Sequence, residues 1–199
     1  MKNLKGSKTE QNLVNAVLFE ARDYQLFSLY EEQAKREGLE EISKKFNELA
    51  SEQKAHANLL THHLKDEDYE VNFTLHFHKL GRTDENLKAA VELEIHEYQD
   101  IYPRYAKEAR EEGYDHIEEI FQMLVQVENC HHMELDKYYQ MMINNKLFSK
   151  SKDTKWKCIN CGRELNSKEA PERCPLCNHK QGFFKEDPDQ NTKNKKQAN

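Results

Sequence analysis

The chain has 199 residues, of which 33% are charged and 37% hydrophobic, and its formal net charge is −6. This charge gives no reason to expect a nucleic acid or an anionic membrane as partner, and no apolar run approaches the ~20 residues that span a bilayer. The N-terminal MKNLKGSKTE lacks the apolar core of a secretory signal, so we expect a cytoplasmic protein. With 6 Gly and 4 Pro, the composition favours long helices with polar faces over β-sheet.

Residues 1–148 carry the apolar periodicity of helices. Ser7 and Glu10 fit a capping box that starts the first helix, while Gly38 and Gly113 are helix stops. Residues 66–81 lose the period and predict a long connection. The first helix should end at about residue 37, and the others should cover about 39–65, 83–112 and 114–146. Two short turns around a long middle crossover predict a mainly α fold, a ferritin-like four-helix bundle.

Each predicted helix has an apolar seam that acids, His or Gln interrupt near its middle. A buried carboxylate costs several kcal/mol unless it is paired or bound to a cation, so polar groups at one depth of a core predict a metal centre. Carboxylates with a few imidazoles from four helices are typical of di-iron or di-manganese centres. A salt-bridged surface stripe is the alternative, and the apolar residues in phase with these side chains disfavour it. The candidate ligands are Glu20, His56, Glu94, Glu97, Glu128 and His131.

An internal repeat places Gln53 at a ligand position. AKREG at 34–38 resembles AREEG at 109–113, and a histidine, His56 or His131, lies 18 residues after each glycine. The residue 15 positions after the glycine is Glu128 in the second half and Gln53 in the first. Gln53 therefore stands where the second half has its candidate carboxylate.

Two irregularities follow from the same register. Glu52 is rotated about 100° from Gln53 around the helix, so it would need a bulge or register shift to reach the centre. Glu94 lies 19 residues before Gly113, whereas the first-half interval from Glu20 to its glycine is 18. The extra residue predicts a π-bulge in the third helix near Pro103.

The C-terminal part carries a separate metal motif. Two CxxC pairs lie within WKCINCGRELNSKEAPERCPLCNHKQGFF at 156–184 and can present four thiolates tetrahedrally. Iron there would be a one-electron carrier and zinc a structural staple. About 30 residues cannot fold on burial alone, so the metal should hold this domain, 152–186, together. We expect 149–155 to be a linker, 187–199 a disordered tail and Cys130 a buried thiol. The four ligands are Cys158, Cys161, Cys174 and Cys177.

The motifs together resemble the rubrerythrins, over nearly the whole chain. The resemblance rests on KNLKGSKTE, on ELEIHEYQDIYPRYAKEAREEGY at 92–114, on the Glu128/His131 pair and on TKWKCINCG with APERCPLC. It implies a di-iron ferritin-like domain, a rubredoxin-like Fe(Cys)4 domain and NAD(P)H-linked reduction of hydrogen peroxide in the cytoplasm, a defence against oxidative stress. It also implies a homodimer that brings one subunit's Fe(Cys)4 centre near the other's di-iron centre, with rubredoxin or an NAD(P)H-dependent reductase as electron donor.

The resemblance also implies roles for individual residues. The six candidate ligands match family ligands by position, and Glu97 and Tyr102 are the candidate catalytic residues. The chain departs from the family at Gln53, where relatives have a Glu that bridges the two irons. It departs again at Phe27, where many relatives have a Tyr, which leaves Tyr24 and Tyr102 as possible hydrogen-bond donors.

Three functions stay open on the sequence alone: a rubrerythrin-type peroxidase, a weakened or non-catalytic metal-binding relative, and ferritin-like oxidation and handling of iron. An amide offers one ligating oxygen and an NH₂ group that donates, so Gln53 should weaken metal binding. Four Glu balance two Fe(II) but not two Fe(III), so the site should favour the reduced state. The attached CxxC domain argues against storage, which needs no tethered electron carrier.

Overall fold

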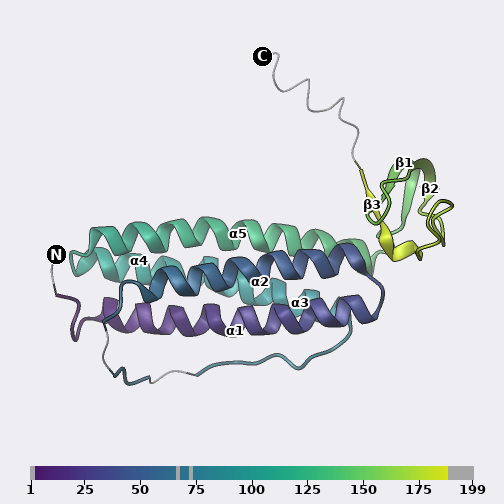
Figure 1. Cartoon of the computed structure of the whole chain (residues 1–199). Helices are drawn as coiled ribbons and strands as arrows, with labels where there is room; N and C mark the ends of the chain where they lie inside the picture. The colour runs from purple at the N-terminus through teal and green to yellow at the C-terminus, as the bar shows by residue number, and fades with distance from the viewer. Residues whose placement is uncertain (1–2, 66–67, 72–73, 188–199) are drawn as a thin grey trace, which may run out of the picture.

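The computed structural model of the chain describes residues 3–65, 68–71 and 74–187. Within these ranges the helices are α1 (Lys8–Arg36), α2 (Glu40–Thr61), α3 (Thr83–His96), α4 (Tyr102–Glu111) and α5 (Asp115–Ile143). A π-helical segment, η1 (Glu97–Ile101), joins α3 to α4 into one long helix. These elements form an elongated four-helix bundle with a long connection along one side, and a small domain lies at one end (Figure 1). The predicted bundle is confirmed, and none of the described helices is long and apolar enough to cross a membrane.

The helix ends follow local sequence signals. The Ser7 side chain accepts a hydrogen bond from the Glu10 N–H at 3.0 Å, but Glu10 accepts from Gly6 N–H, so only half of the predicted capping box forms. Gly38 and Gly113 adopt φ of 76° and 73°, which residues with a side chain rarely adopt. The internal repeat therefore gives each half of the chain an equivalent helix stop. The helix that follows each stop carries candidate metal ligands.

The π-bulge expected from the repeat register is confirmed. The segment η1 starts at Glu97 and ends one residue before Tyr102, and Pro103 follows in the first turn of α4. A proline lacks the N–H that would continue the regular ladder, so wider hydrogen bonding just before it is accommodated at low cost. The bulge adds one residue and leaves Glu94, Glu97 and Ile101 all buried.

Two apolar clusters fill the bundle, with a polar layer between them. Along α2, Leu49 belongs to one cluster and Leu60 to the other, and Gln53 and His56 lie between. Along α5 the order is reversed, from Leu124 to Leu135, because the helix runs the other way. The polar layer is thus sealed at both ends by hydrocarbon side chains.

The small domain is a three-stranded antiparallel sheet in the order β2-β1-β3, so β1 is the central strand. Its elements are β1 (Ser149–Cys158), β2 (Glu164–Glu169), a short 3-10 turn η2 (Gln181–Phe183) and β3 (Phe184–Glu186). The predicted linker at 149–155 is wrong, because these residues already belong to β1. The strand is polar since much of it is exposed, and polarity was the signal for a linker. The expected tail at 187–199 lies outside the described residues apart from Asp187.

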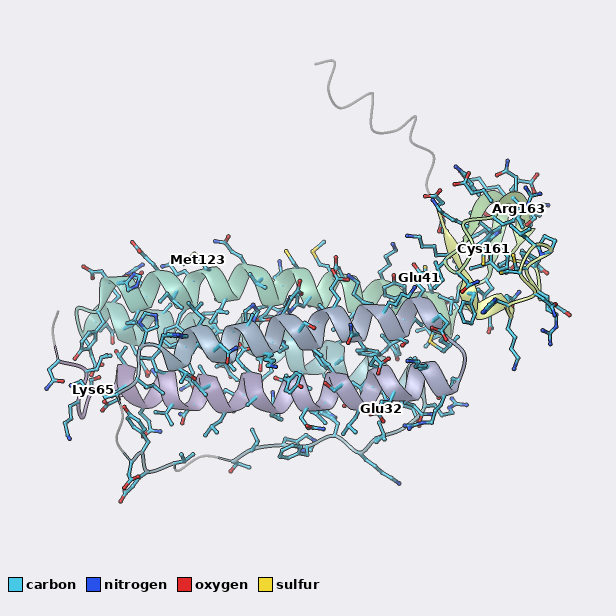
Figure 2. The ribbon with its side chains drawn as sticks, viewed as in Figure 1. Glu32, Glu41, Lys65, Met123, Cys161 and Arg163 are labelled. Carbon is cyan, nitrogen blue, oxygen red and sulfur yellow. The ribbon has the colours of Figure 1, made fainter. Side chains whose placement is uncertain are left out.

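The domain packs directly on the bundle end. A Cβ placed on Gly182 would lie 1.6 Å from the Gly38 carbonyl oxygen, so only glycine allows η2 to approach the α1–α2 turn this closely. Phe148 packs against both the bundle core and the core around Trp156. Figure 2 shows Cys161 and Arg163 in the small domain beyond this end of the bundle, with Glu41 on the neighbouring part of α2.

Candidate metal centres

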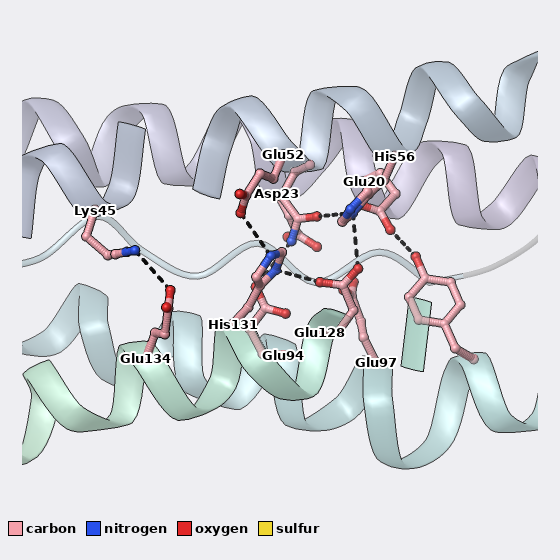
Figure 3. Close-up of polar contacts among 12 residues, drawn as sticks. Glu20, Asp23, Lys45, Glu52, His56, Glu94, Glu97, Glu128, His131 and Glu134 are labelled. Atoms are coloured by element: carbon pink, nitrogen blue, oxygen red, sulfur yellow. Dashed lines mark hydrogen bonds and ion pairs between the residues drawn. The ribbon is translucent and has the colours of Figure 1, made fainter. Parts of the chain in front are cut away.

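Six polar side chains predicted from the sequence converge in the polar layer of the bundle (Figure 3). They come from every long helix: α1, α2, the α3–η1 helix and α5. Each carboxylate among them is at most 1% exposed, so water compensates little of its charge. These side chains are Glu20, His56, Glu94, Glu97, Glu128 and His131.

Glu128 lies at the centre of the layer. One group of potential ligand atoms comes from Glu20, His56 and Glu128, and a second comes from Glu94, Glu128 and His131. Within each group all the ligand atoms lie within 4.8 Å of one another. Glu128 is common to both, so its two oxygens are placed to serve two neighbouring cation positions.

The geometry around Glu128 suits cation binding better than direct hydrogen bonding to the two histidines. His56 Nδ1 lies 3.1 Å from Glu128 Oε1, and His131 Nδ1 lies 2.7 Å from Oε2. Neither Glu128 oxygen has a partner with hydrogen-bond geometry among the described residues, although both are buried. Glu94 Oε2 and Glu97 Oε2 are likewise buried without such a partner. Buried lone pairs of this kind need a common cation, so the residues fit a metal pair.

The charge balance without metal leads to the same conclusion. Burial opposes protonation of His56 and His131, but the neighbouring carboxylates outweigh it and raise the pKa values to about 10 and about 11. Burial and the charge of Glu128 raise the pKa of Glu20 to about 7. The protonated imidazoles therefore supply the positive charge in the metal-free protein, and cations that bind must displace those protons.

Gln53 lies between the two groups. Its Oε1 lies 3.1 Å from His56 Nδ1 in the first group, and its Nε2 donates to Glu94 Oε1 at 3.2 Å in the second. Gln53 is fully buried. The amide thus contacts both groups, with an acceptor end toward His56 and a donor end toward Glu94.

Glu52 lies at the outer edge of the layer and belongs to neither ligand group. Its Oε2 lies 3.1 Å from His131 Nε2, on the ring edge opposite the ligand-facing Nδ1. The α2 helix is regular there, and half of the Glu52 side chain remains exposed. A carboxylate on the second ring nitrogen orients a ligand histidine and increases its basicity.

Two buried charges escaped the sequence prediction. Arg22 and Asp23 on α1 are 8% and 1% exposed, and the Arg22 guanidinium binds Asp23 through two hydrogen bonds of 2.7 Å and 2.6 Å. Arg22 Nη2 also donates to Glu97 Oε1 at 3.1 Å. Asp23 follows Glu20 by three residues, the spacing that relates Glu94 to Glu97, and this was the available signal.

The aromatic residues divide differently from the prediction. The Tyr102 hydroxyl donates a hydrogen bond to Glu20 Oε1, and the tyrosine is fully buried. Tyr24, the other expected hydrogen-bond donor, is 37% exposed with the Lys54 ammonium over its ring, because Asp23 takes the inward place beside it. Phe27 packs in the apolar cluster against Phe46.

Cys130 is exposed, although the sequence predicted a buried thiol.

The four cysteines of the small domain form the third candidate metal group. The sulfurs of Cys158 and Cys177 lie 3.7 Å apart, and those of Cys161 and Cys174 lie 3.6 Å apart. These separations are those of four thiolates around one tetrahedral ion, and all four cysteines are free of disulfides. Trp156 and Phe184 form the apolar core behind them.

Family comparisons agree with this two-centre layout. The rubrerythrin family model matches residues 11–139, and the model of the rubrerythrin rubredoxin-like domain matches residues 156–185. The chain is 37% identical over 188 residues to rubrerythrin-1 of Clostridium acetobutylicum, which covers 92% of this chain and 96% of that protein. It is 34% identical over 184 residues to a rubrerythrin of Nitratidesulfovibrio vulgaris, covering 92% and 96%.

Solved structures agree on the fold. A mixed-valence nigerythrin has a TM-score of 0.58 at 22% identity, covering 92% of this chain and 90% of that one. Symerythrin from Cyanophora paradoxa, reduced with dithionite, has a TM-score of 0.61 at 21% identity, covering 72% and 89%. At this identity the likeness establishes the fold alone.

Proposed function

Since the chain belongs to the rubrerythrin family, we propose that it reduces hydrogen peroxide to water at a di-iron centre in the bundle, with electrons supplied through an Fe(Cys)4 centre in the small domain. The family binds both kinds of iron centre, and the clustered cysteines are consistent with the second. The observation that carries the proposal is the pair of ligand groups that share Glu128, in one chain with a tetrathiolate site. Reduction of one peroxide to two waters takes two electrons and two protons, and two ferrous ions would supply the electrons.

The proposal gives the residues of the polar layer separate tasks. Glu20 and His56 would hold one ion, Glu94 and His131 the other, and Glu128 both. The Tyr102 hydroxyl would fix the Glu20 carboxylate through its hydrogen bond. Burial and the negative charge of Glu20 raise the pKa of Tyr102 well above the usual value, so Tyr102 remains a hydrogen-bond donor at neutral pH. Glu97 lies outside both groups and would bind to the metal pair when the pair needs more negative charge around it.

The Fe(Cys)4 site would be the entry point for electrons. The small domain lies at the end of the bundle, while Gln53 lies 14 residues along α2 from Leu39, about 20 Å at the helical rise. Electron tunnelling over this length within one subunit would be slow. We therefore propose a homodimer in which the small domain of one subunit serves the bundle of the other, with rubredoxin or an NAD(P)H-dependent reductase as the external donor.

The dimer carries its own prediction. We expect light scattering at micromolar concentration to give twice the mass of the chain, and dilution below the dissociation constant to slow electron transfer between the centres. The measurement is the rate at which peroxide oxidises the reduced Fe(Cys)4 centre, followed by its visible absorption, as a function of protein concentration. A monomer with full turnover would contradict the arrangement.

We also propose a cytoplasmic location. The five cysteines, all in the described part of the chain, form no disulfide, and four of them are arranged for a metal. Thiols of this kind persist in a reducing compartment.

The main test is electron counting. The protein is reduced anaerobically, freed of reductant and titrated with hydrogen peroxide. We expect peroxide to restore the visible sulfur-to-iron charge-transfer band, and a Cys174→Ser variant that holds only the bundle irons to consume about half an equivalent less per chain, since the Fe(Cys)4 site holds one electron. A band that peroxide does not restore would contradict the proposed route.

Iron handling is the second candidate function. The observation that favours it is Gln53 in place of the usual bridging carboxylate, because a site weakened in this way would release its iron. The same titration separates the two functions when oxygen replaces peroxide. We expect peroxide to oxidise the reduced pair faster than oxygen does. Faster reaction with oxygen, together with continued oxidation of added Fe(II), would favour iron handling.

A further inference from the structure

We infer that Arg22, held by Asp23, is a positioning residue that retains Glu97 away from the metal positions, so that Glu97 binds iron only when it is released from Arg22. The inference rests on the proposed di-iron site and adds to it a residue pair that controls one of its carboxylates. Its starting observation is that Glu97 is buried and beside the pocket but belongs to neither ligand group.

The contacts of Glu97 differ at its two oxygens. Oε1 accepts a hydrogen bond of 3.1 Å from Arg22 Nη2. Oε2 is buried and has no hydrogen-bond partner among the described residues. Arg22 therefore holds the carboxylate through one oxygen in a position outside both ligand groups, and the other oxygen has no partner as long as the carboxylate stays there.

Arg22 is itself rigidly held. Its Nε and Nη2 donate to the two oxygens of Asp23 at 2.7 Å and 2.6 Å, and its guanidinium lies 5.4 Å from the centre of the Phe19 ring. A planar guanidinium with two such bonds is fixed in direction, which lysine cannot reproduce. Asp23 thus orients the Nη2 group toward Glu97.

The backbone at Glu97 can accommodate a change of ligation. Glu97 is the first residue of η1, where the hydrogen-bond ladder widens, and such segments are common at functional sites. Iron and Arg22 compete for the same carboxylate, and a ferric ion attracts it more strongly than a ferrous ion. Retention by Arg22 should therefore favour the reduced pair, in the same direction as the missing charge at Gln53.

The test uses a variant that preserves the net charge. Arg22→Gln/Asp23→Asn removes one positive and one negative charge; Asn has the shape of Asp, and Gln is shorter than Arg. In protein loaded with two bundle irons, we expect the ratio of oxidised to reduced pair at a fixed potential to rise about tenfold, a fall in midpoint potential of about 30 mV for a two-electron couple. The readout is an anaerobic redox titration followed by Mössbauer spectroscopy, which does not depend on turnover.

The control distinguishes positioning from a structural role. In a Glu97→Gln background the same double substitution should leave the potential unchanged, because no carboxylate remains to be released. Arg110→Gln, which breaks the contact of the exposed Arg110 with Glu118 outside the pocket, should also leave the potential unchanged. Arg22→Lys keeps the positive charge but lacks the planar guanidinium, so it should lower the potential by a smaller amount. This variant replaces the double variant in the test if the double variant loads no iron.

Two results would overturn the inference. One is an unchanged potential in every iron-loaded Arg22 variant, and the other is an equal shift with and without Glu97. Either result leaves the proposed function intact, because the iron pair is present. An unmodified protein that holds no iron in its bundle under iron-rich expression would instead contradict the proposed function and the inference together.

Discussion

Replacement of Glu128 by glutamine is expected to empty both metal positions of the bundle at once. Glu128 is the residue common to the two ligand groups, and its two oxygens lie 3.1 Å and 2.7 Å from the Nδ1 atoms of His56 and His131. With Gln53 already an amide, Glu128→Gln would leave no carboxylate bridge. Loss of one partner from a buried ionic cluster costs roughly 3–5 kcal/mol, or an affinity loss of about 150- to 4,000-fold.

The matched control for Glu128→Gln is Glu118→Gln. Glu118 is also a buried glutamate on α5, and it pairs with Arg110 away from the pocket. Iron analysis after gel filtration should find the bundle irons in the control and not in Glu128→Gln, while the sulfur-to-iron band stays in both. Two retained bundle irons in Glu128→Gln would show that Glu128 is not the shared ligand.

Gln53→Glu is expected to act in opposite directions on the metal-free and the metal-bound protein. A carboxylate there would face Glu94 at the present 3.2 Å contact, so the metal-free protein should lose stability. With metal bound, a second bridge and one more negative charge should tighten iron binding by a few kcal/mol and stabilise the oxidised pair. Chemical denaturation with and without iron, followed by peroxide consumption after anaerobic reduction, measures both effects.

Glu52 provides the control for the Gln53 prediction. Its carboxylate lies 3.1 Å from His131 Nε2 and is the nearest acidic alternative on the same helix. If the unmodified protein already binds two irons and reduces peroxide as fast as Gln53→Glu, then the Gln53 amide does not weaken iron binding. A loss of iron in Glu52→Gln would then show that Glu52 compensates for it.

The bundle and its polar layer could be predicted because periodicity determines which side chains share a helix face. The extra residue before Gly113 likewise revealed η1, since the two halves of the chain had to keep one register. Contacts between helices are not encoded in that periodicity. Tyr24 and Asp23 lie about 100° apart around α1, and only the partner helices decide that Asp23 points inward.

Charge was the least informative signal. Arg22 and Asp23 are adjacent in sequence and belong to none of the predicted motifs, yet both are buried beside Glu97. The polar residues from Ser149 onward resembled a linker, but hydrogen bonds to β2 do not require apolar side chains. Such residues can be recognised only when the neighbouring element is known.

The most direct test of the di-iron centre is Mössbauer spectroscopy of the unmodified protein expressed with ⁵⁷Fe. We expect about three irons per chain: one with the parameters of a tetrahedral sulfur site and two that form a magnetically coupled pair with oxygen and nitrogen ligands. Addition of peroxide to the reduced sample should oxidise all three. A sulfur site accompanied by no iron pair, or by isolated ions that peroxide leaves ferrous, would contradict the claim that this pocket, with Gln53 between its two ligand groups, is a di-iron peroxidase centre.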